Sequence, residues 1–359
     1  MKLIFDCRFI RIDHHDGISR FSSDLFTALS KISAITALVS DEQQLKWLPA
    51  KTDYILGNSP TNPLAELGLP KKLNKAGATH VFSPMQTMGA FGKKYKLVLT
   101  LHDLIYYSHP KAPAFLPLHV RIAWRIYHLN FIAVRMLLNQ ADAVATVSTT
   151  SKGLIERKNL TKRPVHVIYN APESLPNLEV APGQSPRART KKLVYMGSFM
   201  EYKNVETLIM GMKSLSEYEL VLLSKISDKR WKQLRDIAGV ASDQIRFSNG
   251  VSDQEYVDEL SSAFALVSAS KDEGFGIPLV EAMRYATPLV VSDIPIFREV
   301  AEDSAKYFDP TKPLDFVEKV RELEAAGEWE ASSLKSAERA SFYQWDKSAG
   351  ILLNVLSKL

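Results

Sequence analysis

Two carboxylates and two glycines lie close together in the segment 272–283. Glu273 and Glu281 are separated by seven residues that include Gly274, Gly276 and Pro278. An apolar run precedes this segment, and within it a helix-forming sequence follows the glycines. This order predicts a strand, a glycine-rich loop and a helix that begins at Pro278. The loop amides and the helix N-terminus would then face one point, where their partial positive charge favours an anion. The first prediction is therefore a ligand that bears phosphate.

The same two glutamates admit another interpretation, the acid and nucleophile pair of a glycosidase. That interpretation is the weaker one, because Glu281 falls one turn inside the predicted helix while Glu273 lies in the loop before it. A carboxylate on a helix that follows a phosphate loop is better suited to accept hydrogen bonds from sugar hydroxyls, as in dinucleotide folds.

A second glycine loop, 197–204, follows the strand predicted at 193–196 and contains Gly197 and Lys203. Lys203 could neutralise phosphate charge, and the alternative is a solvated lysine before a helix. In the first half, the pair His102 and Asp103 ends a predicted strand, where open α/β sheets place ligands. The alternative is that Asp103 caps the next turn and that His102 is simply hydrogen-bonded. Gly17 stands in a further strand, turn and helix sequence, which alone is a weak signal.

Short apolar runs alternate with helical patterns along both halves of the chain, which predicts parallel sheets covered on both faces. We expect an α/β protein with two Rossmann-like, doubly wound domains and a cleft between them. The first domain spans 1–175, a proline-rich linker spans 176–190, and the second domain spans 191–341. The segment 47–70 has no periodicity and is interpreted as a long surface connection.

Composition is that of an ordinary globular protein, with 46% hydrophobic and 24% charged residues. The single cysteine, Cys7, cannot form an intramolecular disulfide, and no run is apolar enough to span a membrane, so a cytoplasmic location is expected. Residues 1–175 carry 22 Lys and Arg against 12 Asp and Glu, whereas residues 176–359 carry 23 against 28. The basic first half favours an anionic partner such as a membrane surface, a lipid-linked phosphate or nucleic acid, and the alternative is solvated surface charge. Of these partners we predict an anionic membrane surface and no nucleic acid.

The helical pattern at 117–139 mixes basic and aromatic side chains. Such a helix can lie at a lipid interface, and the alternative is a core helix whose arginines extend to water.

The segment from Glu273 to Glu281, with Gly-Phe-Gly-Ile-Pro inside it, resembles the Glu-x7-Glu signature of retaining GT-B glycosyltransferases of glycosyltransferase family 4. Weaker pieces follow in the family's order along nearly the whole chain. They are residues 17–20, His102 with Asp103, Val147 with Ser148, Asn170, Gly197 with Lys203, 250–255 and 286–299.

The resemblance implies roles for the site residues. Glu281 would hold the donor ribose, Glu273 a donor sugar hydroxyl, His102 the transferred sugar, and Lys203 the departing diphosphate. The donor would also meet Gly17, Gly197, Ser198 and the backbone of Gly274, Phe275, Gly276 and Ile277. Many relatives carry arginine where this chain has Ser198. Arg20 or Arg284 could therefore supply extra hydrogen-bond donors to the diphosphate. The resemblance also implies that the last helix, 342–359, packs on the first domain.

The implied activity is transfer of a hexosyl unit from GDP-mannose or a UDP-hexose to a glycan or lipid-linked acceptor, with retention of configuration and with no metal or other cofactor. It would serve the synthesis of a cell-surface polysaccharide or glycolipid, in the cytoplasm or at the inner face of the plasma membrane. Two alternatives stay open, a GT-B sugar-nucleotide epimerase and a noncatalytic nucleotide-sugar-binding protein, the latter suggested by Ser198.

Overall fold

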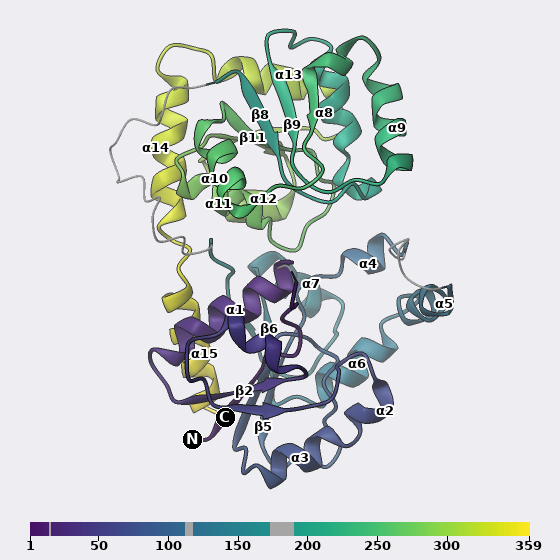
Figure 1. The fold of residues 1–359 in the computed structure, drawn as a ribbon, viewed down its shortest axis with the longest axis vertical. Helices are drawn as coiled ribbons and strands as arrows, with labels where there is room; N and C mark the ends of the chain where they lie inside the picture. Colours follow the sequence, from purple (N-terminus) through teal and green to yellow (C-terminus); the bar gives the residue numbers. More distant parts are fainter. Residues whose placement is uncertain (14–15, 112–117, 173–189) are drawn as a thin grey trace. The chain divides into compact units, whose positions relative to one another are not determined.

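A computed structural model describes residues 1–13, 16–111, 118–172 and 190–359. The chain divides into two compact units (Figure 1). Unit 1 comprises Met1–Glu173 and Gln344–Leu359, and unit 2 comprises Ser174–Tyr343. Of the linker predicted at 176–190, all but Thr190 lies outside the described residues.

Unit 1 is built on a seven-stranded parallel sheet with the order β3-β2-β1-β4-β5-β6-β7. The chain starts in the middle of the sheet, builds outward to β3, and then crosses to β4 on the other side of β1. The strands are β1 (Leu3–Asp6), β2 (Ile35–Val39), β3 (Tyr54–Leu56), β4 (His80–Ser83), β5 (Lys96–Thr100), β6 (Ala143–Thr146) and β7 (Val165–Val167).

The last helix of the chain belongs to unit 1, where it packs against α1. The rings of Phe21 and Trp345 meet edge to face at 5.9 Å, and the Ser348 hydroxyl donates to the Tyr169 carbonyl at 2.7 Å. The helices of unit 1 are α1 (Gly17–Ser30), η1 (Glu42–Trp47), α2 (Pro63–Glu66), α3 (Leu69–Lys75), α4 (Ile105–Ser108), α5 (Leu118–Tyr127), α6 (Ile132–Asn139), α7 (Thr149–Arg157) and α15 (Trp345–Ser357).

Unit 2 repeats the plan with six parallel strands in the order β10-β9-β8-β11-β12-β13. Its strands are β8 (Lys192–Tyr195), β9 (Glu219–Leu222), β10 (Ile245–Phe247), β11 (Ala265–Ser268), β12 (Leu289–Ser292) and β13 (Ala305–Phe308). Its helices are η2 (Glu201–Lys203), α8 (Val205–Met212), α9 (Asp228–Ala238), η3 (Gly239–Gln244), α10 (Asp253–Ser262), α11 (Ile277–Arg284), α12 (Pro295–Ala301), α13 (Pro313–Glu322) and α14 (Glu328–Ala340).

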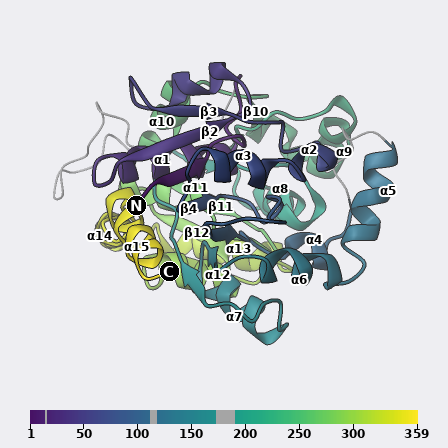
Figure 2. The ribbon, with the colours of Figure 1, turned by 90° about the horizontal axis from the view of Figure 1, so that it is seen from below.

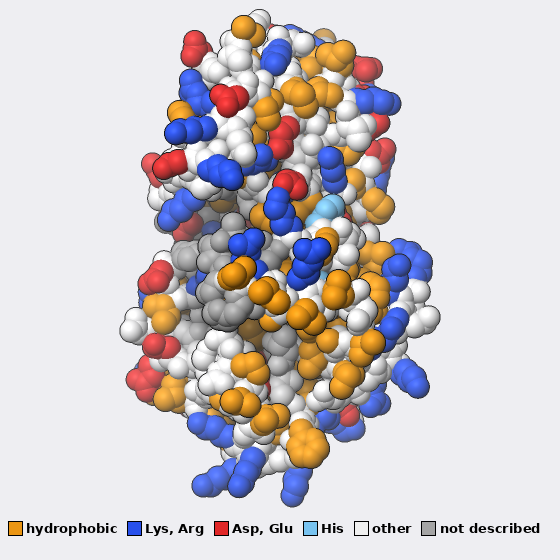
Figure 3. All heavy atoms as spheres, turned by 90° about the vertical axis from the view of Figure 1, so that its right-hand side faces the viewer, with side chains coloured by type: hydrophobic (Ala, Val, Ile, Leu, Met, Phe, Trp, Pro, Cys, Tyr) orange, Lys and Arg blue, Asp and Glu red, His pale blue; other side chains and the backbone are white. Residues whose placement is uncertain are grey.

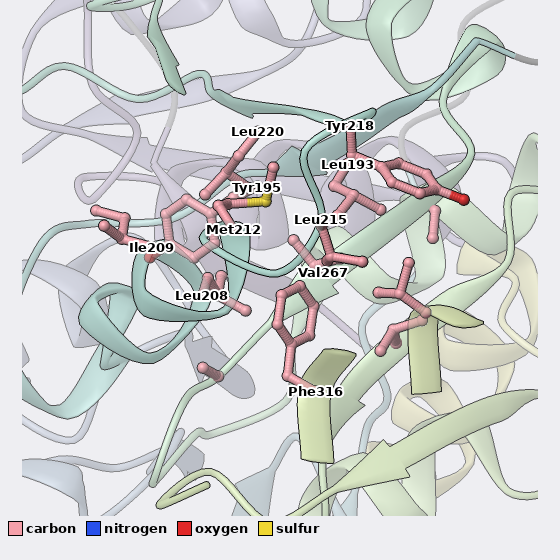
Figure 4. Close-up of a cluster of buried hydrophobic side chains, with 14 of the residues drawn as sticks. Leu193, Tyr195, Leu208, Ile209, Met212, Leu215, Tyr218, Leu220, Val267 and Phe316 are labelled. Carbon is pink, nitrogen blue, oxygen red and sulfur yellow. The ribbon is translucent and has the colours of Figure 1, made fainter. Parts of the chain in front are cut away.

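The core of unit 2 lies where α8 and α13 cover the sheet. Leu208 and Met212 of α8 and Phe316 of α13 are fully buried and meet Tyr195 and Val267 from the strands (Figure 4). Burial of side chains of this size contributes roughly 1.5–3 kcal/mol each, so this cluster fixes the strands whose ends form the site.

The predicted α/β class with two parallel sheets is confirmed, and three details of the prediction are wrong. The segment 47–70 is not one long connection, because it contains β3 and α2. β3 is a three-residue edge strand that is half exposed, too short for periodicity to reveal, and β13 was not anticipated. The helix predicted at 117–139 is two helices, because the Asn130 side chain accepts from the Ile132 amide at 2.9 Å and begins α6 anew.

Candidate active site

The strand order of each sheet defines where a ligand is expected. In unit 2, β8 and β11 lie side by side, but the chain leaves β8 toward β9 and leaves β11 toward β12. The loops beyond two such strands diverge and leave a crevice at their carboxyl ends, which is where open α/β sheets bind ligands. The loop after β8 contains Gly197 and Lys203, and the loop after β11 contains Glu273.

Lys203 and Glu273 meet at this switch point. The Lys203 Nζ donates to Glu273 Oε1 at 2.5 Å, and the Ser270 hydroxyl donates to the same oxygen at 2.8 Å. The two charged side chains are only 16% and 12% exposed. The sequence predicted both residues at the site but could not tell whether the two loops face one ligand. The structure brings their charged atoms into direct contact.

Asn204 and the backbone hold the two loops together. The Lys271 amide donates to the Tyr202 carbonyl at 2.8 Å, so the backbones of the two loops are joined beside the ion pair. Asn204 adopts the left-handed conformation, with φ of 53°, and its side-chain amide donates to the Ala269 and Pro310 carbonyls at 3.1 and 2.7 Å. Asparagine tolerates this conformation better than most residues, so Asn204 fixes Lys203 at a tight turn into α8.

The glycine loop leads directly into α11, which begins at Ile277, one residue before the predicted start, with Pro278 in its first turn. Gly276 has φ of 94°, and a Cβ there would lie 2.9 Å from the Phe297 ring, so only glycine fits without strain. Phe275 is buried, with its ring 5.5 Å from that of Tyr343. Phe275 therefore anchors the loop through its side chain, and only its backbone is suited to the ligand contact that the resemblance implies.

Glu281 lies in the second turn of α11 and is 7% exposed. The Tyr256 hydroxyl, from α10, donates to Glu281 Oε2 at 2.6 Å. This bond to a charged acceptor fixes the carboxylate in a buried position. Tyr256 was missed by the sequence reasoning, although it follows directly after the segment 250–255 that the resemblance marks. Nothing in its spacing links it to a glutamate 25 residues later.

Tyr256→Phe is expected to weaken donor binding about tenfold, because one charge-assisted hydrogen bond that orients Glu281 is lost. Titration of the purified protein with GDP and with UDP would measure the change. The matched control is Tyr218→Phe, which removes a tyrosine bond to Glu324 of 2.8 Å elsewhere in unit 2. Equal affinity in Tyr256→Phe and wild type would contradict an orienting role.

The Gly197 loop differs from the expectation in one respect. The Gly197 amide donates to the Ser224 hydroxyl at 3.1 Å, so this amide already has a partner. Gly197 is required for space instead, because a Cβ there would lie 2.8 Å from the Tyr195 hydroxyl. That hydroxyl donates to the Ser198 carbonyl at 2.7 Å, and burial raises the pKa of Tyr195 well above its usual value, so the donor stays protonated.

The two arginines considered as extra hydrogen-bond donors to the diphosphate lie in different units. Arg284 is the last residue of α11, at the opposite end of that helix from the glycine loop, so its predicted role is not supported. Arg20 lies in the first turn of α1 in unit 1.

In unit 1, α1 begins at Gly17, and the Asp16 side chain caps it by accepting from the Ser19 amide at 2.9 Å. His102 follows β5, with its ring 5.0 Å from that of Phe21. His102 Nε2 lies 2.8 Å from the Pro84 carbonyl, which only accepts, so Nε2 must carry the proton. Asp103 Oδ1 accepts from the Ile105 amide at 3.0 Å, as the capping interpretation predicted.

Burial lowers the pKa of His102 to about 4, against smaller opposing effects of the Pro84 carbonyl and Asp16. The folded protein therefore binds fewer protons than the unfolded chain between pH 6.5 and 4, and this contribution to stability is lost as pH falls through that window. The free energy of unfolding of wild type relative to His102→Gln should drop by about 3 kcal/mol from pH 7 to pH 4. Urea unfolding at several pH values would measure it, and a constant difference would contradict the assignment.

A buried ion cluster at the ends of β1 and β4 was missed by the sequence reasoning. Arg8 donates to both oxygens of Asp6, at 2.8 and 3.0 Å, and to Glu66 at 2.5 Å. Glu66 also accepts from the Gly89 amide at 3.0 Å. Burial alone would lower the pKa of Arg8, but the two carboxylates outweigh it and raise that pKa. The cluster ties together three loops at the carboxyl edge of the unit 1 sheet, so its role is to order this edge.

Comparison with known proteins agrees with this architecture. A solved structure from Anabaena, Alr3699/HepE in complex with UDP-glucose, aligns with a TM-score of 0.72 over 100% of both chains at 15% identity, which shows that the two chains share a fold. The fold is that of the GT-B glycosyltransferases. The family model for glycosyl transferases group 1 matches residues 181–340, and that for glycosyltransferase family 4 matches residues 54–172. The chain belongs to the group 1, family 4 glycosyltransferases.

Two curated relatives are similar in sequence. The O-antigen chain mannosyltransferase RfbU of Salmonella typhimurium is 26% identical over 86% of this chain and 87% of its own length. The GDP-mannose:cellobiosyl-diphosphopolyprenol alpha-mannosyltransferase of Xanthomonas campestris is 26% identical over 52% of this chain and 50% of its own length. Within the described parts of the chain, no helix combines the length and apolar character needed to cross a membrane.

Proposed function

We propose that this glycosyltransferase moves a mannosyl unit from GDP-mannose to a glycan or lipid-linked acceptor, with retention of configuration. The observation that carries the proposal is the contact between Lys203 and Glu273 beside the Gly276 turn at the switch point of unit 2. Mannose and GDP are supported by the names of the two curated relatives, while the UDP-glucose complex of the Anabaena protein keeps a UDP-hexose as the second candidate donor.

In this proposal the Lys203–Glu273 ion pair is present before the donor binds. A bound diphosphate brings two negatively charged groups to the N-terminus of α11, where the helix dipole and the loop amides of 274–277 favour them. Lys203 then turns from Glu273 to the diphosphate. Glu273, kept in place by Ser270, is left to accept a hydrogen bond from a hydroxyl of the donor sugar.

The reaction breaks the bond between the anomeric carbon and the diphosphate oxygen and forms a bond from that carbon to the acceptor oxygen. The proton of the acceptor hydroxyl passes to the departing diphosphate oxygen. Negative charge grows on the diphosphate as the bond breaks. The Lys203 ammonium, which has turned to the diphosphate when the donor binds, stabilises that charge without further reorganisation. Glu281 holds the ribose through its carboxylate, which Tyr256 orients. For unit 1 we propose, from the resemblance alone, that Gly17 contacts the donor and His102 the transferred sugar.

Thermal-shift measurements with GDP, UDP, ADP and dTDP test the donor. A ligand that binds only the folded state raises its stability in proportion to the logarithm of its concentration, so GDP should give the largest shift. No shift with any of the four would contradict the proposal, and a shift with UDP alone would replace GDP-mannose by a UDP-hexose.

Nuclear magnetic resonance of the product then tests the reaction. The anomeric configuration of the transferred sugar should match that of the donor, and inversion would contradict retention. Ser198 keeps a noncatalytic binding protein as the second candidate, which would bind nucleotide tightly without turnover. A new sugar formed in the absence of acceptor would instead identify an epimerase.

We also propose that the enzyme acts at the inner face of the plasma membrane, where a lipid-linked acceptor would be presented.

A further inference from the structure

The outer face of α5 and α6 in unit 1 exposes a row of aliphatic side chains. Leu118, Ile122 and Ile126 follow one another at intervals of four residues on α5 and are 70%, 53% and 63% exposed. Leu129, Ile132 and Met136 continue the row, at 69%, 59% and 65%. A soluble protein normally turns such a stripe toward its own core, so these six exposed aliphatic side chains point to a binding partner.

The aromatic residues of the same helices face the other way. The Trp124 ring meets that of Tyr106 edge to face at 4.7 Å, and His128 lies 5.0 Å from Tyr107. Phe131 stacks on Tyr107 at 4.4 Å. The sequence suggested that basic and aromatic side chains share the helix surface. The structure instead uses the aromatic side to attach α5 and α6 to unit 1, which leaves the aliphatic side outward.

Positive charge borders the aliphatic row on α5 and at its α6 end. Residues 118–163 include eight Lys and Arg against two Asp and Glu. Arg121 and Arg125 are exposed on α5 beside the row. An open hollow of about 480 Å³ adjoins its other end and is lined by Arg135, Met136, Asn139, Lys162 and Arg163. Met136 belongs to both the row and the hollow, so the apolar and the cationic surfaces are continuous.

Both ribbon views place α5 at the outer edge of unit 1 (Figure 1, Figure 2). On the part of unit 1 that faces the viewer in Figure 3, hydrophobic side chains gather with Lys and Arg side chains beside them.

We infer that this α5–α6 face docks unit 1 on an anionic lipid bilayer. A bilayer surface offers an apolar layer for the aliphatic row and negative charge for the Lys and Arg side chains beside it. Amphipathic helices bind in the membrane interface through the same two interactions. A second copy of the chain fits less well, because a two-fold contact would set this cationic face against itself. The inference extends the proposed action on a lipid-linked acceptor, but it depends on no part of the transfer chemistry.

Vesicle flotation of the full chain tests it. Wild type should float with vesicles of phosphatidylglycerol and phosphatidylcholine, should float much less with phosphatidylcholine alone, and should be released by high salt. Ile122→Glu/Ile126→Glu should weaken binding to the anionic vesicles at least about tenfold, because it places two charges in the apolar row. Lys162→Glu should weaken it less, and should do so mainly at low salt.

The matched control is Ile32→Glu/Ile351→Glu, which alters two isoleucines that are 49% and 42% exposed, and it should float like wild type. Ile32 follows α1 and Ile351 belongs to α15, and both ribbon views place these two helices on the opposite side of unit 1 from α5 (Figure 1, Figure 2). Thermal shift with the bound nucleoside diphosphate shows that each variant is folded and separates this test from the proposed function. The inference would be overturned if wild type did not float with the anionic vesicles, or if Ile122→Glu/Ile126→Glu floated as well as wild type. A dimer in light scattering that the same variant dissociates would also overturn it.

Discussion

Lys203→Met lowers the rate of transfer by about 10³-fold while the protein still folds and binds nucleotide. The expectation follows from the position of Lys203, whose ammonium is held within 2.5 Å of Glu273 at the switch point of unit 2 and is only 16% exposed. Removing one preorganised donor from developing negative charge typically costs 10²–10³ in kcat, and here a full charge is lost as well. Release of nucleoside diphosphate from the donor, measured under saturating conditions, reports the change.

Lys229→Met is the matched control, because it removes an exposed lysine of α9 in the same unit and should leave the rate unchanged. A rate for Lys203→Met within tenfold of wild type would show that the charge of Lys203 does not act on the leaving group.

Glu281→Ala lowers kcat/KM by about 10³-fold, with most of the loss in KM. A carboxylate that accepts from two ribose hydroxyls makes two charge-assisted hydrogen bonds, worth about 1.5–3 kcal/mol each. In the proposed complex Glu281 holds the ribose equally in the ground state and in the transition state, so the loss of binding is uniform and raises KM rather than lowering kcat. Steady-state kinetics with varied donor concentration measures both parameters.

Asp258→Asn serves as the control for charge in the Glu281 experiment, since Asp258 is an exposed carboxylate on α10. A fall in kcat at constant KM would assign Glu281 to the chemistry instead of the ribose.

The sequence predicted the fold class and the glycine loop well because both depend on local pattern. Apolar runs with helical patterns between them specify a covered parallel sheet, and the Gly274 to Pro278 sequence specifies a turn into a helix. The short edge strand β3 escaped detection because three residues show no periodicity. The pattern at 117–139 could not show that Asn130 interrupts it, because that break depends on the Asn130 side chain accepting from the amide two residues later.

The arrangement of the candidate site could not be predicted from the sequence. Lys203 and Glu273 were each identified, yet their ion pair joins residues 70 positions apart and is set by the strand order. The partner of Glu281 could not be predicted, since Tyr256 lies on another helix. The Gly197 amide is a similar case. The glycine could be predicted from the sequence, but its amide's bond to the Ser224 hydroxyl could not.

The most direct measurement compares wild type, Lys203→Met and Lys203→Met/Glu273→Gln. For each protein it gives the rate of acceptor-dependent release of GDP from GDP-mannose and the free energy of unfolding in urea. The single variant leaves the poorly exposed Glu273 without its cation, and the double variant removes that unpaired charge. We predict that the double variant recovers stability toward wild type but stays about 10³-fold slow, because the diphosphate still lacks its ammonium. Recovery of both stability and rate would contradict the account, because Lys203 would then serve only to hold Glu273.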